Sequence, residues 1–174
     1  MRLTASWLLL VALGGPLAAQ DFAPPEDEDA PPSTIRFGLH GFSSRLGVDF
    51  RGTNQIVAST AVDLADLYSP NVRLRPSFEI GVAGGGDTYV FNTELMYRFA
   101  SDRERAIPYV GAGIGIYGQP ACNAAPRCPA VWVQFALGFE LQMPGGFNWL
   151  IEYHGEDALR RHRFFLGLAT RRGS

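Results

Sequence analysis

The sequence predicts an all-β protein, an eight-stranded antiparallel up-and-down β-barrel that crosses a membrane. Three observations predict this fold class. The segment 131–142 places a large apolar residue at every second position, as in a β-strand with one apolar and one polar face. Seven further segments alternate in a similar way and are separated by turn residues. On this register the charged residues of the strands all fall on the polar faces.

Composition is consistent with one all-β domain. The chain has 174 residues, the size of a single domain, and 47% of them are apolar, which is ample for an ordered fold. Its 20 glycines and 12 prolines fall mostly between or inside the alternating segments. A formal net charge of −2 argues against nucleic-acid binding.

The first 33 residues have a different composition from the rest of the chain. Residues 1–19 combine a basic start, an apolar run and a small-residue end, which predicts a cleaved secretory signal peptide; a buried helix is the alternative. Residues 20–33 hold five acidic residues and four prolines and are predicted to be a disordered lead-in. The alternative interpretation is that residues 20–33 bind a basic partner or a cation. The barrel domain then spans 34–174.

The first two predicted strands are 34–42 and 55–64. The polar stretch 43–54 between them is predicted to be a long loop, although residues 46–50 alternate and would also fit an extension of the first strand. The second strand has the weakest alternation of the eight.

The third and fourth strands are predicted at 72–83 and 88–99, joined by a tight hairpin at 84–87. Pro76 lies within the third strand and has no N–H to donate to a neighbouring strand. We therefore expect a bulge or local distortion beside it.

The remaining strands follow the same pattern. The fifth is 107–117, whose inward face carries three glycines, and the loop 118–130 leads to the sixth strand described above. A Pro-Gly-Gly turn leads to the seventh strand, 147–156, and the eighth is 162–171. The glycines of the fifth strand lower its β-propensity, so we expect that a neighbouring group needs the space.

Alternation alone does not say which face is inside, since a soluble barrel of the lipocalin type would bury the apolar set. The apolar faces carry about a dozen aromatic rings, too many for an eight-stranded barrel whose interior barely holds side chains. We therefore place the apolar faces toward lipid and the charges inside, where a buried charge must be paired. The predicted luminal charge network comprises Arg36, Asp63, Arg73, Arg75, Glu79, Glu94, Arg98, Glu140, Glu152, His154, Glu156, Arg163 and Arg171.

With an even number of strands and a periplasmic N-terminus, the loops 43–54 and 118–130 face outward and the turn at Pro144 faces the periplasm. In this pattern of strands and loops, the sequence resembles the small outer-membrane β-barrel proteins of Gram-negative bacteria, the OmpA/OmpX-like group, over about residues 34–171. The resemblance implies a barrel located in the cell outer membrane. In that group the last strand often ends on an aromatic residue, whereas this chain ends F-F-L-G-L-A-T-R-R-G-S.

Two cysteines, Cys122 and Cys128, lie in the longer outer loop. In an exported protein a disulfide is the expected state, with a metal or redox role as the alternative. The spacing matches no zinc pattern and no histidine lies nearby, so no metal site is predicted.

Acid–base chemistry is possible at one place, where Glu152, His154 and Glu156 share an inward face and His162 and Arg163 follow across the last turn. The lipid A deacylases, a family of outer-membrane barrels, place a catalytic His-Ser pair near their last strands. Here Gly155 follows the histidine and no serine occurs between residues 101 and 174, so that nucleophile has no match and no catalytic residue is predicted.

The sequence is compatible with three functions. The first is an integral outer-membrane protein with a structural or surface-interaction role carried by its outer loops, monomeric, in contact with outer-membrane lipid and without a cofactor. The second is a soluble, exported barrel that binds an apolar ligand, and the third is a lipid-modifying enzyme. A porin-like pore is disfavoured, because long paired side chains should fill an eight-stranded lumen.

Overall fold

The computed structural model describes residues 35–171 except 53, 85, 101–103, 121 and 123–127. The predicted signal peptide, 1–19, and the predicted lead-in, 20–33, lie outside these residues and stay predictions. No helix long and apolar enough to cross a membrane occurs in the described part of the chain. The described residues form eight strands: β1 (Ile35–Arg51), β2 (Ile56–Leu67), β3 (Val72–Val82), β4 (Thr88–Arg98), β5 (Ala106–Gly118), β6 (Ala130–Gln142), β7 (Phe147–Glu156) and β8 (Arg161–Thr170).

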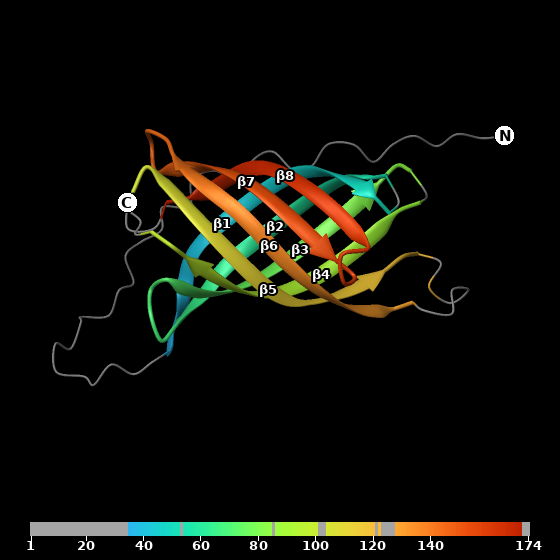
Figure 1. Cartoon of the computed structure of the whole chain (residues 1–174), viewed down its shortest axis with the longest axis horizontal. Coiled ribbons are helices and arrows are strands. Elements are labelled where there is room, and N and C mark those ends of the chain that lie inside the picture. The colour runs from blue at the N-terminus through green and yellow to red at the C-terminus, as the bar shows by residue number, and fades with distance from the viewer. Residues whose placement is uncertain are drawn as a thin grey trace. The chain divides into compact units, whose positions relative to one another are not determined.

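The strands form a closed barrel (Figure 1). Each strand pairs antiparallel with its neighbours in sequence, and β1 also pairs with β8, from Ser43 opposite Ala169 to Arg51 opposite His162. This pairing leaves no free sheet edge along most of the wall, as a barrel in hydrocarbon requires. The predicted eight-stranded up-and-down architecture is confirmed.

The two faces of the wall have opposite chemistry. Val133 and Leu46 point outward and are 67% and 61% exposed, whereas Glu79 and Arg163 point into the lumen and are fully buried. The outer face also carries aromatic rings toward the strand ends, among them Tyr89 and the half-exposed Phe99. The interior is therefore charged and the exterior apolar, the reverse of a soluble barrel with an apolar core.

The first strand is longer than predicted. Residues 43–51, which were expected in the outer loop, continue β1, and their side chains alternate between buried Arg45 and Asp49 and exposed Leu46 and Val48. The register of the β1–β2 ladder shifts between Phe37 and Gly41, just before this part of the strand. The shift breaks the alternation of side chains along the chain, which is why the strand looked shorter in sequence.

The wall is distorted beside Pro76, as predicted. On the β2 side the register shifts between Ala61, which lies opposite Ser77, and Ala65, which lies opposite Leu74. On the β4 side the ladder is regular and Pro76 lies opposite Thr93. The missing N–H of the proline therefore coincides with the irregular side of the strand.

Glycines on the inner face make room for large neighbours. A Cβ added at Gly138 would lie 2.7 Å from the Cε2 atom of the Tyr109 ring, and one added at Gly113 would lie 2.8 Å from Glu94 Cα. Tyr109 is 2% exposed, and its ring lies over Gly138, its register partner on the adjacent strand β6. The glycines of the fifth strand were expected to leave space for another group, and at Gly113 of β5 that space is taken by Glu94 of β4.

The strands are connected at both ends of the barrel. We call the end formed by 52–55, 83–87, 119–129 and 157–160 the loop end, and the opposite end, where β1 begins and β8 ends, the terminal end. At the loop end, 119–129 is the longest connection. Asp157, Ala158 and Leu159 all have positive φ values of 49°, 53° and 66°, so the β7–β8 turn is built from consecutive left-handed residues.

Candidate functional site

The centre of the lumen is organised around Glu152 of β7. Its carboxylate accepts a hydrogen bond from Arg45 Nη1 of β1 and another from Tyr109 Oη of β5 at 2.6 Å. Arg75 Nη1 of β3 lies 3.5 Å from Glu152 Oε2, and His154 Nε2 contacts Glu152 Oε1. Four strands thus place charged or polar groups on one buried carboxylate, as a charge removed from water requires.

A second carboxylate, Glu79 of β3, lies beside this group. Arg163 Nη1 of β8 is 2.5 Å from Glu79 Oε2 and 3.1 Å from Glu156 Oε1, so one guanidinium bridges two acids. Asn92 Nδ2 donates to Glu79 Oε1 at 3.0 Å, and His154 Nδ1 lies 3.4 Å from the same oxygen. His154 therefore connects the Glu79 pairs to the Glu152 pairs.

Further pairs lie toward the terminal end. Asp63 accepts hydrogen bonds from Arg73 Nη1 at 3.0 Å and from Arg75 Nε at 2.9 Å. Arg98 Nη2 donates to Glu140 Oε2 at 3.1 Å, and Asn148 Nδ2 donates to the same oxygen at 2.9 Å. Asp63 and Glu140 thus accept from residues of neighbouring strands, while Arg98 of β4 reaches Glu140 of β6 past the intervening β5.

The residues predicted for the luminal charge network are all buried except Arg36 and Arg171. Arg36 lies opposite Asp66 in register but is exposed, because β8 pairs with β1 from Ser43 onward and leaves the first residues of β1 at the open terminal end. Arg171 follows β8, where its Nη2 donates to the carbonyl oxygen of Met143 at 2.7 Å.

Several luminal groups were missed in the sequence. Arg45 and Asp49 were assigned to a loop, although the apolar alternation of residues 46–50 would have placed both on the inner face. Gln134 Nε2, which donates to Glu94 Oε1 at 2.6 Å, and Tyr109 were missed because an uncharged residue on a polar face carries no distinct sequence signal.

The residues considered for acid–base chemistry separate in the structure. His162 lies on the outer side of β8, its Nδ1 2.5 Å from Tyr153 Oη and its ring stacked on Phe50 at 5.7 Å. It cannot join His154 in the lumen, because it precedes inward-facing Arg163 and adjacent side chains of a strand point to opposite faces. In the described part of the barrel, His154 contacts carboxylates and a guanidinium rather than a serine.

Two sets of side chains bring potential metal ligands within 4.8 Å of one another, Glu79, His154 and Glu156, and Glu94, Glu152 and His154. Arg163 pairs with the carboxylates of the first set and Arg45 with Glu152 of the second. A guanidinium thus already supplies positive charge to each set, and the geometry favours ion pairing over metal binding.

At the loop end an aromatic pair lines the mouth of the lumen. The rings of Tyr117 and Trp132 stack with their centroids 4.3 Å apart, and both are at least 90% buried. The Arg161 guanidinium of β8 lies over them, 5.0 Å from the Tyr117 centroid and 4.7 Å from the Trp132 centroid. These are cation–π distances, and they join β8 to the β5–β6 hairpin.

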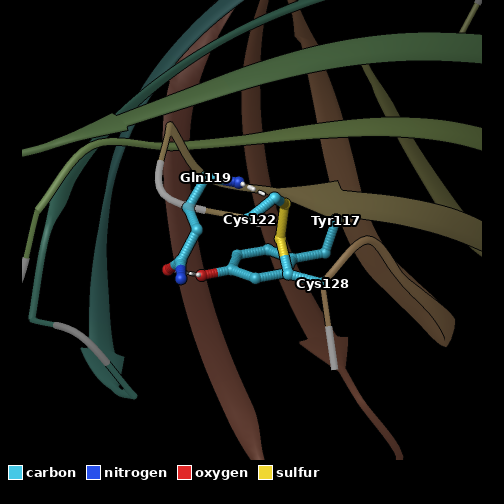
Figure 2. Close-up of a disulfide and its surroundings, with 4 residues drawn as sticks. All are labelled: Tyr117, Gln119, Cys122 and Cys128. Carbon is cyan, nitrogen blue, oxygen red and sulfur yellow. Dashed lines mark hydrogen bonds between the residues drawn. A yellow bond between two sulfur atoms is a disulfide. The ribbon is translucent and has the colours of Figure 1, made fainter. Parts of the chain in front are cut away.

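The predicted disulfide joins Cys122 and Cys128 beside Tyr117 (Figure 2). Their Cα atoms lie 4.8 Å apart. Gln119 N contacts Cys122 Sγ at 3.5 Å, and Tyr117 Oη donates to Gln119 Oε1 at 3.2 Å, as Figure 2 shows. The bond thus connects the two ends of the connection between β5 and β6.

No protein family model matches the chain, and no curated protein matches it in sequence. Several solved structures, however, are similar to it in fold. The N-terminal β-barrel domain of Pseudomonas aeruginosa OprF is similar with a TM-score of 0.58 at 14% identity, over 76% of this chain and 98% of that one. A de novo designed transmembrane β-barrel is similar with a TM-score of 0.52 at 12% identity, over 76% of this chain and 96% of that one.

Neisserial surface protein A is similar with a TM-score of 0.50 at 8% identity, over 75% of this chain and 94% of that one. At these identities the likeness concerns the fold. The chain therefore has the fold of small eight-stranded transmembrane β-barrels, in agreement with the resemblance noted in the sequence.

Proposed function

We propose that the chain is an integral outer-membrane protein whose barrel has a closed lumen and whose loop end interacts with molecules at the cell surface. The observation that carries this proposal is the chemistry of the outer wall. Large apolar side chains cover it, while the exposed charged residues of the described chain lie at strand ends or in turns: Arg36, Arg51, Asp87, Glu104, Arg105 and Arg160. A charge at the middle of the lipid-facing wall costs roughly 2–4 kcal/mol, so this distribution suits hydrocarbon.

The lumen supports a structural role rather than conduction. Arg163, Tyr109 and Phe165 are among the largest fully buried side chains, and eight strands make an interior just wide enough for side chains. The paired charges around Glu152 and Glu79 occupy the same space. We infer that the barrel is an anchor with a plugged interior.

The loop end supports a surface role. Three of its four connections are short, while 119–129 is longer and carries the disulfide. On the predicted orientation this hairpin faces the cell exterior. The soluble-carrier alternative is disfavoured by a charged rather than apolar interior, and the prediction that the chain is not an enzyme stays a prediction.

The proposal is tested by fractionation and gel mobility. The protein should be recovered in the outer-membrane fraction, and its unboiled form should migrate differently from the boiled form, because a closed barrel resists detergent. A periplasmic protein of known location serves as the fractionation control. Recovery of the chain in the soluble periplasm without a mobility shift would contradict membrane insertion.

A further inference from the structure

The barrel wall has an open edge at the loop end. The β6–β7 ladder begins at Phe135, opposite Gly155, whereas on the other side β6 stays paired with β5 as far as Ala130, opposite Tyr117. Residues 130–134 therefore have no β7 ladder partner within the described chain. In Figure 1 the β5–β6 hairpin accordingly extends past the end of β7 and β8. One long contact, Ala158 N to Val133 O at 3.5 Å, links the turn 157–160 to this edge.

A pocket of about 380 Å³ lies at this open edge. Val131 belongs to the apolar outer face and is 73% exposed, whereas Trp132 belongs to the inner face and is buried. Both line the pocket, so residues of both faces of β6 border it. The complete lining is Tyr117, Ala130, Val131, Trp132, Asp157, Arg160 and Arg161.

The pocket has an available cationic donor. The Arg161 side chain is 18% exposed, but its Nη1 atom is buried and has no hydrogen-bond partner among the described residues; it forms an ion pair with Asp49 Oδ2 at 3.9 Å. That carboxylate is also 3.7 Å from Arg163 Nε, so its charge is shared between two arginines. A buried guanidinium nitrogen that lacks a hydrogen-bond acceptor is costly, and a bound anion would supply that acceptor.

Two features favour a phosphate ester on an apolar carrier over a free anion. Arg160, which is exposed, lies next to Arg161, and guanidinium groups bind phosphate in a planar, bidentate geometry. The wall formed by Val131 and the aromatic pair supplies apolar contact beside the charges. Asp157 adds one carboxylate, which suits a head group that also offers an ammonium or hydroxyl donor.

We propose that this pocket binds the phosphorylated head group of a membrane lipid, held by Arg160 and Arg161 with the acyl chains directed along the outer wall past Val131. The inference rests on the proposed membrane insertion, because the lipid must reach the pocket from the bilayer. On the predicted orientation that lipid belongs to the outer leaflet.

The test is a fluorescence titration of the folded full chain in a neutral detergent. The probes are dihexanoyl phosphatidylethanolamine, dihexanoylglycerol, which lacks the phosphate, and inorganic phosphate. The phospholipid should change the emission saturably, and the Trp132→Phe variant should remove that change. Arg160→Gln should weaken binding about tenfold or more, as expected for the loss of a charge-assisted hydrogen bond. Arg51→Gln, on the same rim outside the pocket lining, is the matched control and should bind like the unmodified chain.

Each other outcome overturns the proposal. Unchanged affinity in both Arg160→Gln and Arg160→Gln/Arg161→Gln would exclude the arginines. An equal response to dihexanoylglycerol would indicate apolar adsorption, and equal affinity for inorganic phosphate would indicate a free-anion site. Because the Arg160 side chain is exposed, its variant keeps the test decisive if the double variant does not fold. Titrations use barrels that already show the gel shift, so failure here is distinct from failure of membrane insertion.

Discussion

At the scale of single residues, buried charge is the feature that distinguishes this interior. Glu152 is 1% exposed and contacts Arg45, Tyr109, Arg75 and His154. A buried ion pair adds little to the free energy of unfolding compared with two apolar residues in its place. Removing one member alone is costly, because the other member stays buried without its partner. The network therefore makes each of its members sensitive to single substitution.

This sensitivity can be measured with Glu152→Ala. The variant should lower the free energy of unfolding by about 3–5 kcal/mol, because it leaves the buried Arg45 guanidinium without its carboxylate. The measurement is a urea titration of the folded barrel, followed by the loss of the unboiled gel band. Glu104→Ala, in an exposed turn, is the matched control and should change stability by less than about 0.5 kcal/mol. Equal midpoints for the two variants would contradict a stabilising network.

At the scale of elements, alternation predicted the strands well wherever the ladder is regular. In β4 and β6 the buried and exposed residues follow the predicted faces. The error lies in β1, where a register shift near Phe37 and the small residues Ser43, Ser44 and Gly47 interrupt the pattern. A bulge depends on the partner strand, so the sequence of one strand does not reveal it.

The outward face of β6 gives a prediction at this scale. Leu137 is 46% exposed and lies near the middle of the strand, so Leu137→Arg should impair membrane insertion by roughly 2–4 kcal/mol. Phe99→Arg, beyond the end of β4, is the control and should cost about 0–1 kcal/mol, because a charge near the interface reaches water. Insertion is measured as the fraction of each variant that folds into lipid vesicles and shows the gel shift. Similar folded fractions for both variants would mean that the apolar wall does not face lipid.

At the scale of the whole molecule, the sequence predicted closure, strand number and which face is inside. The volume of the side chains predicted which face is inside, since the aromatic rings of the apolar face could not fit into an eight-stranded lumen. Which luminal charges pair could not be predicted. Arg163 of β8 pairs with Glu79 of β3 inside the barrel, although 84 residues separate them in sequence. Side-chain length and the stagger of the strands together decide which luminal side chains come within contact distance.

These pairs also decide whether the barrel conducts. Arg163 joins Glu79 and Glu156, and the large side chains of Tyr109 and Phe165 are also buried in the barrel, so we expect no continuous water path through the described lumen. The purified barrel, inserted into a planar lipid bilayer, should therefore give no stepwise current under an applied voltage. A water-filled porin inserted under the same conditions is the positive control, and the gel shift of the same preparation establishes that the barrel is folded. Regular current steps that scale with the amount of folded protein would contradict the closed lumen and would turn the paired charges into candidates for ion selectivity.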